Sequence, residues 1–320
     1  MLKRWLCQAE IALDLICVDP VLIKSGYATI EGPDMVPVVT YRQGKTEYLF
    51  PGSSLKGVVR AQGERIVRTL RKDMVCVPYC QKKEDACPKD DIHMACGSRL
   101  ECVEESVRSA EIYRHSCPAC RTFGSLQFTG RAAIGDAYPV GTPPVVEDRD
   151  GVGIDRVTGG AVPGAKFELR VITSGTFRTT ISVRNFELWQ LGLLYYLLCD
   201  FKDERLRVGS GKSRGLGRVK GEVRSFRIAY PKETSRLSGI YELSAKEDQE
   251  AYGLFDSSSV AVALPQPPTV SGLRHTYDIT DGWEEITKAT APMFNRFVET
   301  GYGTGLTWKD SMDRFVSSKS

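Results

Sequence analysis

A tight turn that leads directly into an amphipathic helix is the feature that most constrains the fold. In the stretch Phe50–Arg60, a Pro-Gly pair favours a turn, and Ser53 or Ser54 can cap the first free amides. Apolar residues then recur at helical spacing, which predicts a helix over Ser53–Lys72 with one face on a core. Its unpaired amides and Lys56 favour a bound phosphate, although a plain capped helix would have the same sequence.

Positive charge is concentrated in two segments of a chain whose net charge is only +3. Residues 56–72 carry six Lys or Arg against one Glu, and residues 205–227 carry eight against one Glu. Such clustering is typical of a protein that binds a phosphate backbone, and a solvated face is the alternative.

Cysteines are crowded into one part of the sequence. Seven of the ten lie between Cys76 and Cys120, and the last two form a CxxC motif. We find no signal peptide and no 18-residue apolar run, so we expect a cytoplasmic protein without a membrane partner. Thiols stay reduced in the cytoplasm, which argues against disulfide bonds between these cysteines. The pattern favours a structural zinc site over free thiols or a redox CxxC. The expected ligands are Cys76, Cys87, Cys117 and Cys120, with Cys80 as first alternative.

The other segments alternate between strand and helix signals. We expect a strand over 11–17, a hairpin around 43–45, a strand over 130–138, an exposed loop over 141–150 and a projecting hairpin over 153–165. Strands then continue over 167–172 and 177–183 with a turn at Ser174–Gly175, and a buried helix capped by Asn185 runs to about Cys199. After a strand over 218–226, we expect a strand over 258–264 and helices over 282–289 and 292–299. The order predicts an α+β fold with a ferredoxin-like (RRM-like) β-α-β-β-α-β core.

A Gly-rich basic loop occupies residues 209–218, with the sequence GSGKSRGLGR. Its letters suggest a nucleotide-binding P-loop, as a nucleotidase would need, but that motif requires a glycine where Leu206 stands. The loop also leads into a strand-like segment instead of opening a helix. We interpret it as a flexible loop whose amides and basic side chains approach a phosphodiester backbone.

Four motifs occur in a fixed order: PGSSLKG at 51–57, CPACRTFGS at 117–125, GIDRVTGGA at 153–161 and GSGKSRGLGR at 209–218. Together they resemble the RAMP superfamily of CRISPR proteins. The likeness spans roughly Ile11–Phe226 and is closest to the guide-RNA-binding backbone subunit of type III effector complexes, in the subset with a cysteine-rich zinc insertion.

The resemblance implies an RNA-binding domain over 1–228, with a zinc insertion over 73–120 and a thumb hairpin over 140–170, followed by an extension of unknown role over 229–320. In the family, the first helix and the Gly-rich loop hold the guide RNA (crRNA), and the thumb enters the guide–target duplex. The residues that match these roles are Ser53, Ser54, Lys56, Arg60, Ile154, Arg156, Lys212, Ser213, Arg214 and Arg218.

Asp34 resembles the family's catalytic aspartate, which promotes attack of a 2′-OH on the adjacent phosphodiester with Mg²⁺ or Mn²⁺. The expected activity is therefore metal-dependent endoribonuclease cleavage of target RNA. A non-catalytic structural subunit is the alternative. The implied partners are guide RNA, target RNA, the large polymerase-like subunit and neighbouring RAMP subunits.

Overall fold

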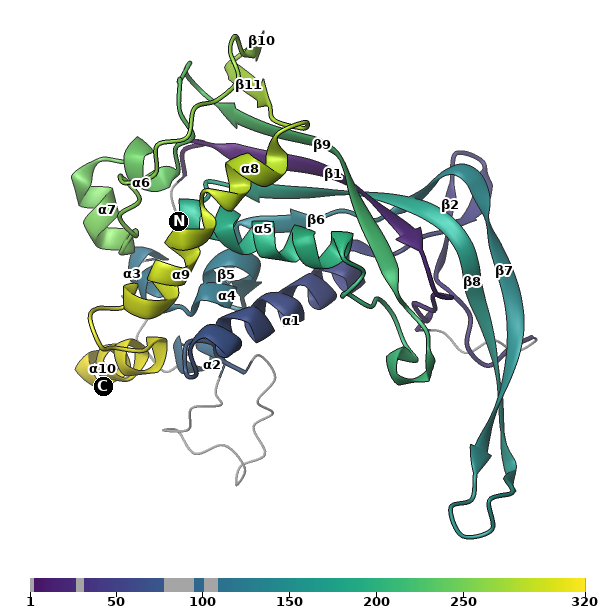
Figure 1. The fold of residues 1–320 in the computed structure, drawn as a ribbon. Coiled ribbons are helices and arrows are strands. Elements are labelled where there is room, and N and C mark those ends of the chain that lie inside the picture. The colour runs from purple at the N-terminus through teal and green to yellow at the C-terminus, as the bar shows by residue number, and fades with distance from the viewer. Residues whose placement is uncertain (1–2, 27–31, 78–94, 101–108, 320) are drawn as a thin grey trace.

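The computed structural model describes residues 3–26, 32–77, 95–100 and 109–319 (Figure 1). A seven-stranded antiparallel sheet lies at the centre, in the order β10-β11-β9-β1-β8-β6, with β7 also paired to β8. Its strands are β1 (Gln8–Cys17), β6 (Ala132–Ile134), β7 (Tyr138–Ile154), β8 (Ala161–Arg184), β9 (Val219–Tyr230), β10 (Thr269–Ser271) and β11 (Arg274–Asp278).

The period-2 pattern of β1 explains its central place in the sheet. Ala9, Ile11, Leu13 and Leu15 are buried on one face, where they join the main core. The expected strand over 11–17 is therefore confirmed, and it begins three residues earlier.

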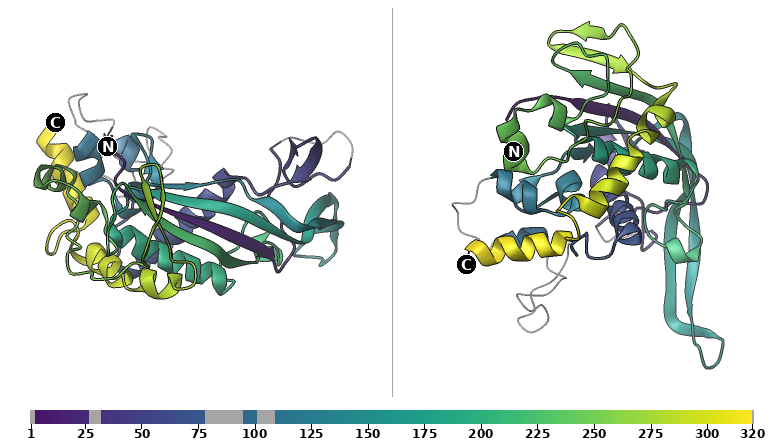
Figure 2. Two further views of the ribbon diagram at one scale, coloured as in Figure 1. Left: turned by 90° about the horizontal axis from the view of Figure 1, so that it is seen from above. Right: turned by 60° about the vertical axis from the view of Figure 1, so that its left-hand side comes forward.

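Two helices cover this face of the sheet (Figures 1 and 2). They are α1 (Gly52–Leu70) and α5 (Leu188–Lys202), and the first confirms the predicted helix. The cap expected from Asn185 is wrong, because Glu187 is the N-cap of α5. Asn185 instead has a positive φ of 49°, and its Oδ1 accepts the amides of Leu6 and Cys7, which fastens the chain before β1.

The hairpin formed by β7 and β8 projects from the sheet (Figure 1). It is longer than predicted: residues 141–150 belong to β7, and Ser174–Gly175 lies within β8. The register of the β7–β8 pair shifts between Val140 and Val145. Two prolines of β7 lie in this interval, and they have no amide hydrogen to donate to β8, the one strand that β7 pairs with in the described sheet. A proline-rich exposed segment thus continues as a strand.

Residues after 230 pack onto the same core. The predicted helices appear as α8 (Trp283–Lys288) and α9 (Ala291–Thr300), whereas the strand expected over 258–264 is wrong. Trp189 of α5 stacks on Phe297 of α9 with ring centroids 4.1 Å apart. Trp308, fully buried at the start of α10 (Trp308–Lys319), donates through Nε1 to the carbonyl of His115.

The remaining elements are short. The expected hairpin around 43–45 is confirmed by β2 and β3, which form a separate two-stranded sheet. The short elements are β2 (Val39–Arg42), β3 (Lys45–Tyr48), α2 (Cys96–Leu100), α3 (Ser109–His115), α4 (Pro118–Phe123), β4 (Gly124–Ser125), β5 (Phe128–Thr129), η1 (Lys212–Arg214), α6 (Ile240–Leu243) and α7 (Lys246–Tyr252). No helix in the described part of the chain is long and apolar enough to span a membrane.

Candidate metal centre and nucleic-acid groove

Four buried cysteines meet between the end of α1 and the CxxC turn. The Sγ atoms of Cys76, Cys96, Cys117 and Cys120 all lie within 4.8 Å of one another. Cys76 Sγ is 3.6 Å from both Cys117 Sγ and Cys120 Sγ. Tetrahedral zinc with Zn–S bonds of about 2.3 Å would place its sulfurs about 3.8 Å apart. Four thiols with this spacing fit a structural zinc ion, and the site has no position left for water.

Three of the four expected ligands are in this cluster, and Cys96 is the fourth. Cys87 and the alternative Cys80 lie outside the described residues. Cys96 begins α2, and its Sγ accepts the amide of Cys117 at 3.3 Å. The spacing of the cysteines in the sequence could not select Cys96, because the segment that carries it has no regular motif.

Hydrogen bonds around the CxxC turn favour the ionised form of Cys117. Cys117 is the N-cap of α4, and its Sγ accepts the amide of Cys120 at 3.4 Å. Burial opposes ionisation, but hydrogen bonds from Cys120, Cys76 and Cys96 hold the pKa of Cys117 well below its ordinary value. A metal ligand needs this thiolate form.

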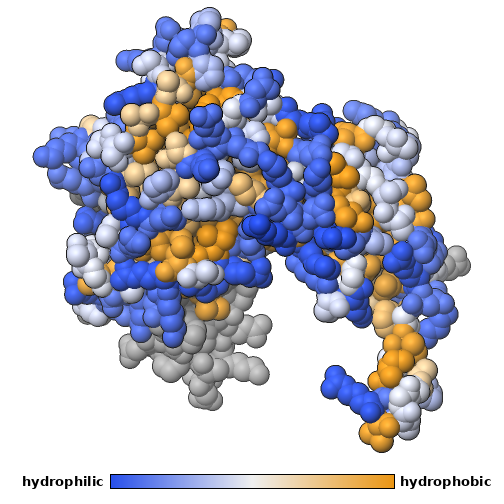
Figure 3. Space-filling view, in the orientation of Figure 1, coloured by the Kyte–Doolittle hydropathy of each residue, from blue (hydrophilic) through white to orange (hydrophobic). Residues whose placement is uncertain are grey.

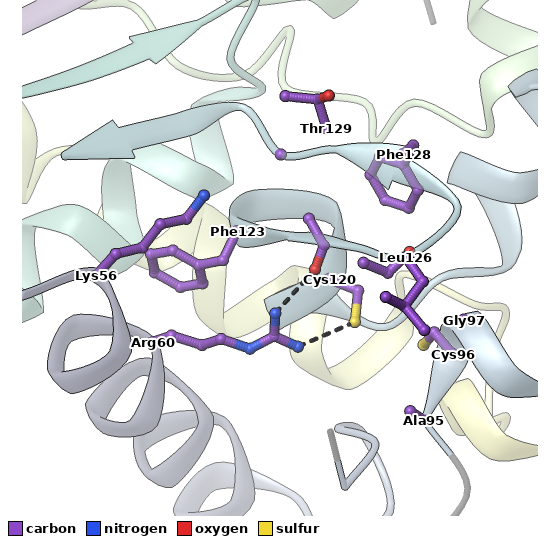
Figure 4. A pocket seen from close by; sticks show the side chains of 13 residues that line it. Lys56, Arg60, Ala95, Cys96, Gly97, Cys120, Phe123, Leu126, Phe128 and Thr129 are labelled. Carbon is purple, nitrogen blue, oxygen red and sulfur yellow. Dashed lines mark hydrogen bonds between the residues drawn. The ribbon is translucent and has the colours of Figure 1, made fainter. Parts of the chain in front are cut away.

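Arg60 of α1 lies against the cysteine cluster (Figure 4). Its guanidinium donates to Cys120 Sγ at 3.3 Å, Gly124 O at 2.8 Å and Glu64 Oε1 at 2.9 Å. Burial lowers the pKa of Arg60, but the negative charge at Cys120 and the hydrogen bond to Glu64 outweigh it and raise the pKa overall. The predicted RNA contact of Arg60 therefore competes with bonds that tie α1 to the cysteines.

The start of α1 is not capped as the sequence predicted. Neither serine hydroxyl caps the helix; instead, Asp136 Oδ1 accepts the amide of Gly52 at 2.7 Å. A Cβ on Gly52 would lie 2.4 Å from the carbonyl oxygen of Ile134, so this end of α1 packs tightly on the segment after β6. Ser53 is exposed and Ser54 half-buried, so both hydroxyls remain accessible to a ligand.

A basic groove runs between α1 and the segment that enters the Gly-rich loop. It has a volume of about 190 Å³. Its cationic lining residues are Arg65, Arg205, Arg207 and Lys212, and the part of the chain that the structure describes contributes no carboxylate to its walls. Arg65 of α1 and Lys212 of the loop line the same groove, and burial together with the charge of Arg65 lowers the pKa of Lys212. Their juxtaposition supports the expectation that both face one polyanion.

The Gly-rich loop has a defined shape. Gly211 and Gly215, both with positive φ, flank the short helix η1, and Ser213 and Arg214 are exposed on it. A Cβ on Gly217 would lie 2.2 Å from Val208 O, so that glycine serves close packing. Three of the ten residues are thus helical, whereas the sequence predicted a flexible loop.

The last basic residue of this loop is already paired. Arg218 bonds Asp19 at 3.1 and 3.2 Å and lies 3.6 Å from Glu204. Lys212 donates to none of the described residues through its side chain, and its exposure leaves it accessible to a phosphate.

A small apolar cluster joins the Gly-rich loop to the base of the hairpin. It contains Leu22, Leu169, Val171 and Leu216, with Met35 and Phe167 packed against it. Arg214 adds a contact, because its guanidinium lies 5.3 Å from the centroid of the Phe167 ring. The loop, the hairpin base and the residue after Asp34 are therefore neighbours.

Asp34 is exposed at the base of the hairpin. Its Oδ2 accepts the amide of Glu168 on β8 at 2.8 Å, while Met35 forms a parallel bridge to Leu169. Within the described ranges, the only group of three or more metal-ligating side chains is the cysteine cluster. Among the described residues, Asp34 therefore belongs to no preformed site of three or more metal ligands.

The tip of the hairpin exposes apolar side chains (Figure 3). Val157 is 94% exposed and Ile154 is 57% exposed, and Arg156 lies between them. Asp155 Oδ1 accepts the amides of Val157 and Thr158 at 2.8 Å, which fixes the turn. An apolar tip on a fixed turn can insert between stacked groups of a partner.

The open face of the sheet carries paired charges. Asp14, only 2% exposed, accepts from Arg178 at 2.6 and 2.9 Å and from Arg224 at 2.6 Å. Burial alone would raise the pKa of Asp14, but these bonds outweigh it and hold the pKa below its ordinary value. The two arginines are therefore partly neutralised within the protein. Arg205 of the groove is also paired, with Asp200 and Asp203, but Arg65 and Lys212 form no ion pair with a described residue, so the groove remains the stronger candidate for RNA.

A helix-backed antiparallel sheet, four clustered cysteines that could hold a metal ion, a basic groove and a long hairpin together define the class: an α+β protein with a cationic surface. Residues 14–220 match the family model of the RAMP superfamily, and the chain belongs to that superfamily. Membership indicates a CRISPR-associated function with RNA binding. A search among curated proteins found no match to the chain.

Proposed function

We propose that this protein is a backbone subunit of a type III CRISPR effector complex that binds guide RNA and the guide–target duplex. The groove in which Arg65 of α1 and Lys212 of the Gly-rich loop lie together carries this proposal. The hairpin acts as the thumb. Its apolar tip enters the duplex, and neighbouring RAMP subunits and the large polymerase-like subunit complete the complex in the cytoplasm.

The strand order supports a ferredoxin-like core. If β1, α1, β6, β8, α5 and β9 are the six core elements, then their sheet order is β9-β1-β8-β6 with every neighbour antiparallel. That is the arrangement of two interleaved β-α-β units. The β10–β11 hairpin and the thumb are then additions at either side of this core.

In the catalytic form of the proposal, Asp34 promotes cleavage of target RNA. Asp34 Oδ1 makes no hydrogen bond with a described residue, so it can accept a proton from a 2′-OH or help to hold a divalent ion. The bond from the Glu168 amide fixes the carboxylate against one arm of the hairpin, where it would face RNA that lies along that arm. Cleavage then yields a 2′,3′-cyclic phosphate and a 5′-OH.

A non-catalytic structural subunit is the second candidate. It is favoured by two observations: among the described residues Asp34 belongs to no group of three metal-ligating side chains, and its Oδ2 already accepts the Glu168 amide. The lengths of labelled target fragments separate the two candidates, because only a cleaving subunit gives regularly spaced cuts.

Replacing Lys212 with alanine tests RNA binding directly. We expect weaker binding of single-stranded RNA and a salt dependence reduced by about 0.7 per lost phosphate contact. The measurement is fluorescence anisotropy at several salt concentrations. Lys246→Ala removes the same charge from a side chain that is 82% exposed on α7 and should change neither quantity. Equal effects of the two variants would contradict the groove.

Replacing Gly57 with alanine should have opposite effects on stability and on binding. Gly57 is exposed in the interior of α1, and a Cβ there would meet nothing within 4 Å. Alanine should therefore stabilise the protein by about 0.5–1 kcal/mol. If RNA contacts α1 at this point, the added methyl should weaken RNA binding at least about fivefold.

Chemical denaturation and anisotropy measure these two effects of Gly57→Ala. Ala251→Gly, at an exposed position on α7 away from α1 and the groove, is the control. It should lower stability without a matching loss of RNA affinity. Unchanged RNA affinity in Gly57→Ala would place the RNA away from this turn.

A further inference from the structure

A pocket of about 350 Å³ lies between the first turns of α1 and the segment that carries the CxxC motif (Figure 4). Its walls combine aromatic and aliphatic side chains with two cations and with Cys96 and Cys120 of the cysteine cluster, and no carboxylate is among the described residues that line it. The lining residues that matter here are Lys56, Arg60, Phe123, Leu126, Phe128 and Thr129. This combination suits a flat, partly apolar molecule that carries a negative charge.

Arg60 presents a fixed flat surface to the pocket. Its three bonds to Glu64, Gly124 and Cys120 occupy N–H groups at the edge of the guanidinium and hold its plane in place. An arginine held in this way offers a ligand its face, and nucleobases stack on guanidinium planes and on aromatic rings. Phe128, half-buried on β5, supplies such a ring on the wall of the pocket.

Lys56 brings a cation to the same pocket. It is half-buried and makes no hydrogen bond or ion pair with any residue that the structure describes. Arg60, one turn along α1, adds to the positive field, and the two cations disfavour each other. An anion on Lys56 would relieve this repulsion, and a phosphate is the anion that RNA supplies.

We propose that this pocket binds one unpaired nucleotide of the RNA that lies on α1, with its base against Arg60 and Phe128 and its phosphate on Lys56. This inference rests on the proposed function, because it takes the RNA to cross the start of α1. It extends the binding surface beyond the groove at Arg65 and Lys212, to the opposite side of the helix.

The test compares two probes on the full chain: fluorescein-labelled oligoadenylate and an abasic oligoribose phosphate of equal length. Phe128→Leu should weaken oligoadenylate binding about tenfold and leave the abasic probe unaffected, because only a base stacks on the ring. Lys56→Met should weaken the binding of both. Phe128 also contacts the Tyr113 ring at 6.0 Å, so thermal unfolding must show that the variant folds.

Leu126, at the rim of the pocket, allows a second measurement of base binding that does not require a change to Phe128. Leu126 is 81% exposed, so Leu126→Trp should fold normally, and a stacked adenine should quench the added fluorescence. The abasic probe should not quench it. Absence of quenching together with unchanged oligoadenylate affinity in Phe128→Leu would overturn the proposal.

Two further outcomes separate the pocket from the proposed function. If Phe128→Leu weakens the binding of a second copy of this chain and leaves RNA binding unchanged, the pocket is a protein contact and the nucleotide assignment is overturned. If Lys212→Ala weakens both probes while Phe128→Leu weakens neither, then RNA binding stands and the pocket proposal alone fails.

Discussion

Replacing Cys117 with serine is expected to abolish stoichiometric zinc binding and to lower the free energy of unfolding by more than about 3 kcal/mol. Structural zinc contributes on the order of 10 kcal/mol in small zinc domains, and loss of one thiolate leaves three ligands in a buried site. Elemental analysis and chemical denaturation measure the two effects. Purified wild-type protein should contain about one zinc per chain.

Two comparisons make the zinc experiment specific. Cys199→Ser alters a half-buried cysteine on α5, outside the cluster, and should retain the metal. Cys96→Ser should lose zinc as Cys117→Ser does, whereas Cys87→Ser should keep it, because the four thiols already complete a tetrahedron. Zinc loss in Cys87→Ser with retention in Cys96→Ser would restore the ligand set expected from the sequence.

Replacing Asp34 with asparagine is expected to reduce target RNA cleavage at least about 100-fold in a reconstituted complex, because a positioned general base typically contributes that much. Asparagine keeps an oxygen that can accept the amide of Glu168, so the fold at the hairpin base should persist. RNA affinity should stay within about twofold, since only one exposed charge changes and salt screens exposed charges.

The control for Asp34 is another exposed carboxylate on the same hairpin. Asp150→Asn breaks an ion pair with Lys166 at 3.4 Å and removes the same charge from β7. Cleavage should continue in that variant. If Asp34→Asn also cleaves at the normal rate, the catalytic assignment is wrong and the structural subunit is the better description.

Local signals in the sequence were sufficient for the elements that local interactions determine. The helix after Pro51, the hairpin around 43–45 and the helices near 283 and 291 follow from turn residues and apolar spacing within a few residues. The metal site was predictable as a class, because a buried thiol cluster needs several cysteines whatever their order.

Long-range contacts could not be predicted in the same way. The cap of α1 comes from Asp136, 84 residues further along the chain. In the sequence, nothing distinguishes Arg60 from the other cations of the basic helix. Its hydrogen bond to Cys120 depends on how the chain folds. Asn185 looks like a helix cap, but residues near the N-terminus compete for its side chain. In each case the local sequence is compatible with more than one role for the side chain, and a residue far away in the sequence determines which role it takes.

The continuity of β8 has a consequence for the dimensions of any complex. One unbroken strand carries the core, the Glu168 amide that holds Asp34 and the start of the tip at Ala161. The seven residues of extended chain from Ala161 to Glu168 place the Asp34 carboxylate about 23 Å from the tip of the hairpin. The length of the hairpin therefore fixes how far its tip lies from Asp34. Adding two residues to each arm would lengthen the hairpin by about 7 Å and keep every side chain on its present face. Adding one residue to each arm would move the side chains to the opposite face.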